Sequence, residues 1–112
     1  PAIALPDIIL SDPDGDEQVT ATLELDTDPY YASILRNGVA DNLYNPVTGK
    51  WEITGSISQV NTALSDVMFV PDNGFAIPTT GTSISVEIKD QTQTKKGNIW
   101  IMQNQSFFEI LD

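Results

Sequence analysis

Apolar and polar residues alternate along much of this chain, and this alternation predicts β-strands. The clearest strand covers residues 18–25, where Thr and Glu fill the positions between apolar residues. Such a strand has one buried and one hydrated face, as in an antiparallel sheet. A second strand is expected over residues 83–89, then a polar hairpin loop over 91–97 and a last strand over 97–102 that is apolar on both faces. The pattern therefore predicts an antiparallel β protein.

The middle of the chain combines three structural signals without a gap. A strand pattern that starts at Trp51 ends at a glycine. Ser56 then occupies a helix N-cap position, with Gln59 three residues later as in a capping box, and apolar residues follow at helical spacing. This predicts a helix of about two turns over residues 56–64, followed by a further strand over residues 67–71.

These elements predict an all-β, Greek-key-like sandwich of about seven strands with one short helix. We expect a single domain over residues 1–112, with an incoming linker or edge strand at 1–6 and a C-terminal extension, or the start of a following module, at 103–112. Because the chain begins with proline, we interpret it as a segment of a longer polypeptide. The residues expected to face inward are Val19, Ala21, Leu23, Ile34, Trp51, Ile53, Val60, Leu64, Phe69, Ile84, Val86 and Ile88.

The chain is strongly acidic. Its 112 residues include 16 Asp and Glu against 5 Lys and Arg, which gives a formal net charge of −11. Such a surface repels phosphate backbones and anionic lipids, so we expect neither nucleic-acid binding nor membrane insertion, and no apolar run approaches the length of a membrane span. The charge either attracts metal cations or serves only to keep the chain soluble.

The chain contains neither cysteine nor histidine. Disulfides, thiolate metal sites and Ser-His-Asp arrangements are therefore excluded, and stability must come from packing, either alone or together with bound hard cations. No Gly-rich phosphate loop is present, since the Gly49-Lys50 pair lacks the required glycine spacing and the following Ser or Thr. We expect that the protein is not an enzyme.

The sharpest local feature is an acidic turn, SDPDGDE, at residues 11–17. Its aspartates at every second position, Asp12, Asp14 and Asp16, would bring carboxylate oxygens together on one loop, and Ca²⁺ prefers oxygen ligands in irregular geometry. The spacing is not that of an EF-hand. The alternative is an ordinary acidic β-turn whose side chains bond to their own backbone.

The central unit also resembles a known family. The residues that carry the resemblance lie within 9–90: Gly55-Ser56-Ile57, Val60-Asn61, Ala63-Leu64, Phe69-Val70-Pro71 and Gly74, followed by the strand from Ile84 to Asp90. They are similar to the cadherin-like or immunoglobulin-like β-sandwich repeats that occur in tandem in very large bacterial surface adhesins of the RTX and VCBS kind.

The resemblance implies an extracellular, non-catalytic module whose partners are neighbouring repeats of the same polypeptide. It also implies stiffening by Ca²⁺ at acidic loops, with Asp12, Asp14 and Asp16 after the first strand and Asp90 at the domain exit as ligands. The expected location is therefore the cell surface.

Two alternatives remain. The apolar C-terminal segment favours a virion or surface-assembly domain, in which Trp100, Met102, Phe107 and Phe108 pack on a neighbouring subunit. A weaker alternative is carbohydrate binding through Tyr30, Tyr31 and the loop at Pro78. Tyrosines in the strand expected over residues 30–35 are, however, more often core residues with a hydrated hydroxyl.

Overall fold

A computed structural model of the chain describes residues 2–6, 18–37, 41–103 and 105–110. Within these residues the chain forms nine strands and one helix, which confirms the predicted all-β sandwich. The elements are β1 (Ile3–Ala4), β2 (Gln18–Leu25), β3 (Ala32–Arg36), β4 (Tyr44–Asn45), β5 (Lys50–Ser56), α1 (Ile57–Leu64), β6 (Val67–Pro71), β7 (Thr82–Lys89), β8 (Thr94–Ile101) and β9 (Ser106–Ile110).

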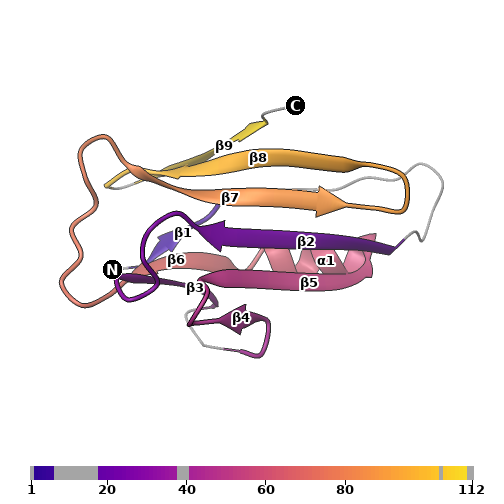
Figure 1. Cartoon of the computed structure of the whole chain (residues 1–112), viewed down its shortest axis with the longest axis horizontal. Coiled ribbons are helices and arrows are strands. Elements are labelled where there is room, and N and C mark those ends of the chain that lie inside the picture. Colours follow the sequence, from indigo (N-terminus) through magenta and orange to yellow (C-terminus); the bar gives the residue numbers. More distant parts are fainter. Residues whose placement is uncertain (1, 7–17, 38–40, 104, 111–112) are drawn as a thin grey trace.

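The strands form two antiparallel sheets. The larger sheet has the order β4-β5-β2-β7-β8-β9, and the smaller has the order β1-β6-β3. Figure 1 shows the six-stranded sheet in front, with the smaller sheet and α1 side by side behind it. The molecule measures 45 × 28 × 20 Å, and the long strands run along its longest axis.

The helix begins where the sequence places its cap. The hydroxyl of Ser56 accepts a hydrogen bond from the Gln59 backbone N–H at 3.2 Å, and the Gln59 side-chain oxygen accepts one from the Ser56 N–H at 2.9 Å. This is the predicted capping box. On the inner face of the helix, Val60, Ala63 and Leu64 are buried. The helix depends on this packing, since eight residues are too few for a helix to be stable alone in water.

The core lies between the two sheets. Every residue predicted to face inward is buried or, for Ile53 and Ile88, partly buried against the core. Trp51 is fully buried, as expected for the largest apolar side chain of the central unit. The predicted alternation along β2 is therefore confirmed. Its buried residues, which lie in the same core cluster as the residues of the smaller sheet, are Val19, Ala21, Leu23 and Leu25.

Contacts between sheets close the two long sides of the sandwich. On one side the hydroxyl of Ser106 in β9 donates to the backbone carbonyl of Ala4 in β1 at 2.8 Å. On the other, the Tyr44 hydroxyl donates to the carbonyl of Ala32 at 3.5 Å, joining β4 to β3. These contacts connect edge strands of one sheet to edge strands of the other.

Two boundaries differ from the prediction. Lys95 and Lys96, expected in a polar loop, lie in β8, where they pair with Ile88 and Glu87 of β7. Tyr30 and Tyr31, expected in a strand, form a turn, and β3 starts at Ala32. In each case the pairing with a neighbouring strand, and not the local polarity, decides where the element ends.

Candidate binding surface at the loop end

Four connections gather at one end of the sandwich, which we call the loop end. Neighbouring strands in each sheet are antiparallel, so strands end and begin at the same place. At the loop end β2, β6 and β8 end, and β3, β5, β7 and β9 begin. The connections cover residues 26–31, 46–49, 72–81 and, apart from residue 104, 102–105. They lie at the left in Figure 1.

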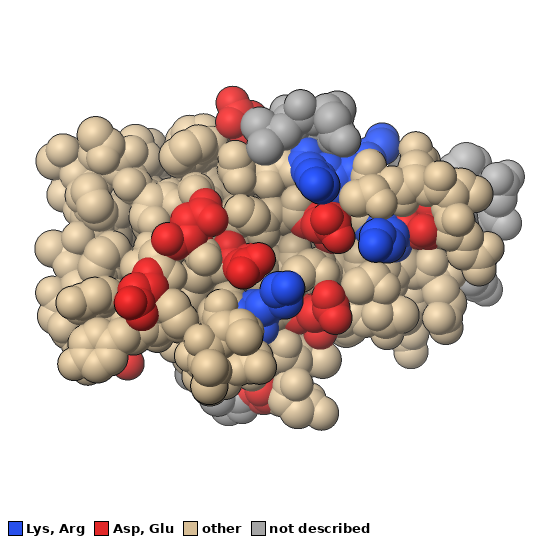
Figure 2. Space-filling model, in the orientation of Figure 1, with Lys and Arg blue, Asp and Glu red and all other residues tan. Residues whose placement is uncertain are grey.

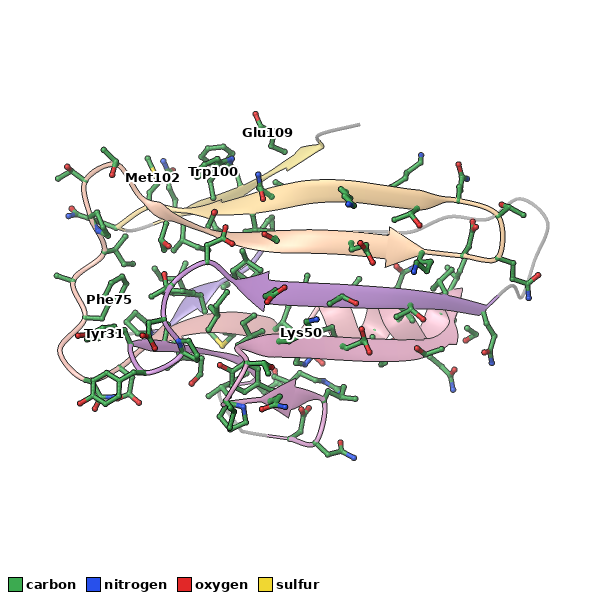
Figure 3. The ribbon with its side chains drawn as sticks, in the orientation of Figure 1. Tyr31, Lys50, Phe75, Trp100, Met102 and Glu109 are labelled. Carbon is green, nitrogen blue, oxygen red and sulfur yellow. The ribbon has the colours of Figure 1, made fainter. Side chains whose placement is uncertain are left out.

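Three aromatic rings contact one another at the loop end, and we call them the aromatic cluster. The Tyr30 and Tyr31 rings meet edge to face with centroids 5.0 Å apart, and the Tyr31 and Phe75 centroids are 5.8 Å apart. Tyr30 is 64% exposed and Tyr31 41% exposed, whereas Phe75 packs partly buried against the core. Figure 3 shows Tyr31 and Phe75 together at this end. The cluster is therefore an exposed platform of two roughly perpendicular rings on a partly buried base.

Hydrogen bonds within the β2–β3 connection, and between it and the β6–β7 connection, hold this platform in place. The Asp28 carboxylate accepts from the Tyr30 backbone N–H at 2.9 Å, and the Asp28 carbonyl accepts from the Tyr31 N–H at 2.9 Å. From the other loop, the Asp72 N–H donates to the Tyr31 carbonyl at 2.8 Å, and the Asn73 side-chain amide donates to the Tyr30 carbonyl at 2.6 Å. Both tyrosine backbones are thus fixed from two directions.

The charges at the loop end are all acidic. Its connections contain Asp26, Asp28 and Asp72 and no Lys or Arg. The Asp26 carboxylate accepts hydrogen bonds from the hydroxyls of Ser83 and Ser85, which ties it to the start of β7. In Figure 2 the charged side chains toward the left of this face are red, and the blue ones lie further right, over the middle of the six-stranded sheet.

Of the four predicted calcium ligands, one lies among the described residues. Asp12, Asp14 and Asp16 lie outside the described residues. Asp90 begins the turn between β7 and β8, where its carboxylate accepts from the backbone N–H groups of Thr92 at 2.7 Å and Gln93 at 2.8 Å. These bonds, with that of Thr92 the larger cause, lower the pKa of Asp90 below its ordinary value. In the described part of the chain, no group of three or more acidic side chains could hold a metal ion.

The predicted partner-binding residues separate into different places. Trp100 and Phe107 are directly opposite each other on the outer face of β8 and β9, and the Trp100 indole N–H donates to a Glu109 carboxylate oxygen at 3.1 Å. Phe107 is 48% exposed, whereas Phe108 faces inward and packs against the core. Met102 lies in the turn after β8 (Figure 3). The structure therefore brings Trp100 and Phe107 together but separates them from Phe108.

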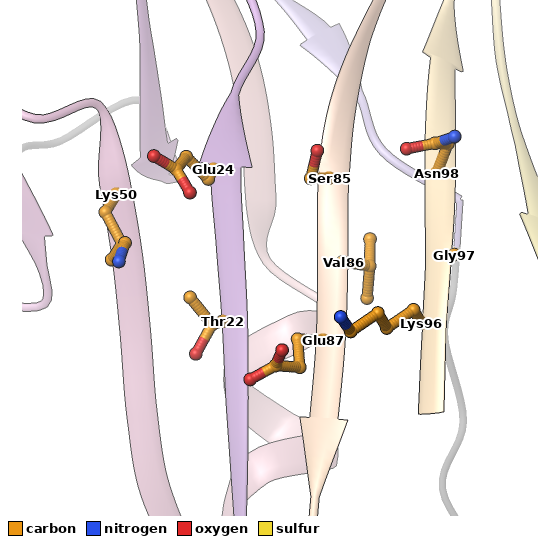
Figure 4. Close-up of a pocket in the computed structure, with 9 residues that line it drawn as sticks. All are labelled: Thr22, Glu24, Lys50, Ser85, Val86, Glu87, Lys96, Gly97 and Asn98. Carbon is orange, nitrogen blue, oxygen red and sulfur yellow. The ribbon is translucent and has the colours of Figure 1, made fainter. Parts of the chain in front are cut away.

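A shallow open hollow of about 300 Å³ crosses the outer face of the six-stranded sheet (Figure 4). Its charges alternate across neighbouring strands, since Lys50 lies opposite Glu24 and Lys96 opposite Glu87. Such pairs are the usual means by which a hydrated sheet face is stabilised. The residues that line the hollow are Thr22, Glu24, Lys50, Ser85, Val86, Glu87, Lys96, Gly97 and Asn98.

Sequence reasoning found the two tyrosines but missed Phe75 and Asn73, which come from a connection more than forty positions later. A signal existed, because Asn-Gly after Pro-Asp predicts a tight turn, and Asn73 and Gly74 both have positive φ. That signal locates the turn but not the loop that it meets.

Comparison with protein-family models, with curated proteins and with solved structures finds no significant match to this chain. Among the described residues, no helix has both the length and the apolar character that crossing a bilayer requires.

Proposed function

We propose that this chain is a non-catalytic structural and adhesion module of an extracellular surface protein, linked end to end with neighbouring modules. The direction of its first and last strands carries the proposal. β1 is antiparallel to β6 and β9 is antiparallel to β8, and both β6 and β8 run toward the loop end. β1 and β9 therefore both run away from it (Figure 1).

This direction suits a linear array. When the chain enters and leaves a module in the same sense along the long axis, the next module continues that axis instead of folding back beside the first. A stalk built in this way lengthens by roughly the 45 Å long dimension for each module added. The absence of histidine and cysteine from the sequence, together with the paired charges in the hollow, favours a structural role over a catalytic one.

Small-angle X-ray scattering on tandem fusions of two and three copies tests the array. We expect the maximum dimension to grow by roughly 45 Å with each copy, because the modules share one axis. A two-copy fusion whose maximum dimension stays close to that of one module would mean that the copies lie side by side, and would overturn the proposal.

Calcium binding at acidic loops belongs to the same proposal. In its support, the ladder between β2 and β7 pairs Thr20 with Lys89, so the Asp90 turn lies beside the start of β2, which follows the DPDGD segment in sequence. Bound Ca²⁺ would neutralise carboxylates that repel one another, and that binding free energy would appear as stability.

Thermal melting in EDTA and then in Ca²⁺, titrated from micromolar to millimolar, tests the calcium site. We expect a saturable rise in melting temperature that Mg²⁺ does not reproduce and that Asp14→Asn removes. Asp66→Asn, in the turn after α1, is the matched control and should leave the rise intact. An unchanged melting temperature would remove calcium from the proposed function.

One observation favours the second candidate, a virion or surface-assembly domain. Phe107 is 48% exposed beside Trp100 on an edge strand, and edge strands with exposed apolar side chains are sites of association. Sedimentation from micromolar to millimolar concentration tests it. Self-association that Phe107→Ser abolishes and Val47→Ser leaves unchanged would favour assembly, whereas a monomer throughout would count against it.

A further inference from the structure

We infer that the aromatic cluster at the loop end is a binding site for a neutral glycan. This inference goes beyond the structural role proposed above and does not depend on it. The cluster joins residues of the β2–β3 and β6–β7 connections, so the site exists only in the folded chain.

The exposure of the two tyrosines is the first observation. Four large apolar side chains are clearly exposed in the described part of the chain, and two of them, Tyr30 and Tyr31, are adjacent and in ring contact. Single exposed apolar residues need no explanation, but a contiguous aromatic surface on a protein marks a site of interaction. Neither tyrosine belongs to the core or packs against it as a buried side chain, whereas Phe75 does pack against it.

The rigidity of the cluster is the second observation. The backbones of Tyr30 and Tyr31 are hydrogen-bonded from both loops, and the Tyr31 ring rests on Phe75. A ligand that binds there does not have to order the loops, so less free energy is lost on binding. Tyrosine supplies a large contact area at a small entropic cost, and it is for this reason common in recognition loops, together with Asn, Ser and Gly.

The chemistry of the surrounding groups selects the ligand. A pyranose ring has a face of C–H groups, which the negative face of an aromatic ring attracts, and a rim of hydroxyls, which need hydrogen-bond partners. Among the described residues, one carboxylate oxygen of Asp28, one of Asp72 and the amide oxygen of Asn73 have no protein partner. These are acceptors for sugar hydroxyls next to the rings.

The charge of the loop end restricts the class of glycan that could bind there. The loop end has three aspartates and no Lys or Arg in its connections, so phosphorylated, sulfated or uronic-acid glycans would be repelled. A basic peptide is the competing ligand. It is less favoured because Asp28 and Asp72 each use one carboxylate oxygen to hold a backbone N–H of their own loop, and Asp26 is bound to two serine hydroxyls.

In an array, the preceding module would join at this same end, because β1 runs away from the loop end. β1, through which the chain enters the sandwich, and β3, which follows Tyr31, are the two opposite edges of the three-stranded sheet. The incoming chain therefore lies across β6 from the tyrosines.

Two-dimensional ¹H–¹⁵N NMR of the labelled chain tests the inference with three neutral probes: cellohexaose, laminarihexaose and mannohexaose, each titrated to about 10 mM, the range of weak binding. We expect at least one probe to cause saturable shifts of the backbone amides of Asp28, Tyr30 and Tyr31 and of residues 72–76. A lysine-rich hexapeptide is titrated in parallel.

Variants distinguish binding at the aromatic cluster from non-specific binding to exposed aromatic side chains. Tyr30→Ala combined with Tyr31→Ala should weaken binding by at least about tenfold, because both rings are lost from the platform. Trp100→Ala combined with Phe107→Ala is the control, since it removes another aromatic pair, of which Phe107 is exposed and Trp100 partly buried, from β8 and the edge strand β9, and it should leave affinity unchanged. Tyr30→Phe with Tyr31→Phe keeps the rings and should retain part of the affinity even if the alanine pair unfolds the loops.

Three outcomes would overturn the inference. These are no saturable shift with any of the three sugars, shifts confined to the hollow or to β9, and shifts of the loop-end amides by the lysine-rich peptide alone. The last would identify a basic peptide as the ligand. None of these outcomes affects the scattering of the tandem fusions, so failure of the glycan site and failure of the array can be told apart.

Discussion

Gly81 and Gly74 show how surroundings decide what a residue tolerates. Both have positive φ, 84° and 75°, which side chains other than glycine rarely adopt. A Cβ on Gly81 would lie 2.6 Å from the Met102 sulfur and 2.8 Å from the Ile101 carbonyl oxygen, whereas a Cβ on Gly74 would meet nothing within 4 Å. The turn after β8 therefore leaves no room for a Cβ atom at Gly81, whereas a Cβ atom at Gly74 would point into open space.

We expect Gly81→Ala to destabilise the chain more than Gly74→Ala does. The strain of positive φ, about 1–2 kcal/mol, is common to both variants, and the clash adds about 1–3 kcal/mol at Gly81 alone. Urea unfolding of the two variants measures the difference. Equal losses would show that the β8–β9 turn moves away from Gly81 at little cost.

The stability that the Asp90 carboxylate contributes depends on pH. Its carboxylate is held by the Thr92 and Gln93 N–H groups, so the pKa of Asp90 is lowered on folding. The folded chain then binds fewer protons at this site than the unfolded chain. The resulting stability is complete above the ordinary pKa of an aspartate and is lost as pH falls through the lowered pKa.

NMR titration of the Asp90 carboxyl should therefore give a pKa below that of an aspartate in a peptide. In urea unfolding between about pH 7 and about pH 2, the stability advantage of the native chain over Asp90→Asn should be constant near neutrality and shrink in acid. Asn keeps an acceptor oxygen for the turn but does not titrate. An unshifted pKa would mean that the turn opens in solution.

At the scale of elements, the helix is where local sequence and structure agree best. α1 begins at Ile57 after the Ser56 cap and ends at Leu64, within one residue of the predicted range. The capping box and the apolar spacing are both local, so they are visible in the sequence. Strand boundaries agree less well, because β8 extends over two lysines only where β7 offers paired backbone groups.

Ser56→Ala should destabilise the chain by about 0.5–2 kcal/mol, the usual cost of losing an N-cap, because it removes the acceptor for the Gln59 N–H. Ser58→Ala is the matched control within the same helix, and it should change stability by less than about 0.5 kcal/mol, since Ala is the better helix former at an exposed site. Chemical unfolding measures both. Equal effects would mean that packing alone, and not the cap, holds α1.

At the scale of the whole molecule, the net charge of −11 should oppose folding. Raising NaCl from 0.01 to 1 M shortens the screening length from about 30 Å to about 3 Å, and at low salt that length exceeds the 28 × 20 Å cross-section. The carboxylates then repel one another across the entire molecule. Screening should relieve this repulsion in the folded state more than in the expanded unfolded state.

We expect the melting temperature at neutral pH to rise with NaCl. The same change in salt near pH 4.1, the isoelectric point of the sequence, should have little effect, because the net charge is then close to zero. Differential scanning calorimetry at the two pH values measures this. A neutral-pH melting temperature that falls with salt would show that attractive pairs such as Lys50 with Glu24 outweigh the general repulsion.

The sequence by itself determined the sandwich, the inward faces of its strands and the capped helix, because alternation, helical spacing and caps are properties of neighbouring residues. It also pointed to Tyr30 and Tyr31, although as strand residues. Only the tertiary structure decided that they form a turn, and that Phe75 and Asn73 meet them from another loop. It alone also separated Phe108 from Trp100 and Phe107, which turn to opposite faces. Contacts between distant segments depend on which strands pair and in what register, and no local pattern in the sequence specifies that choice.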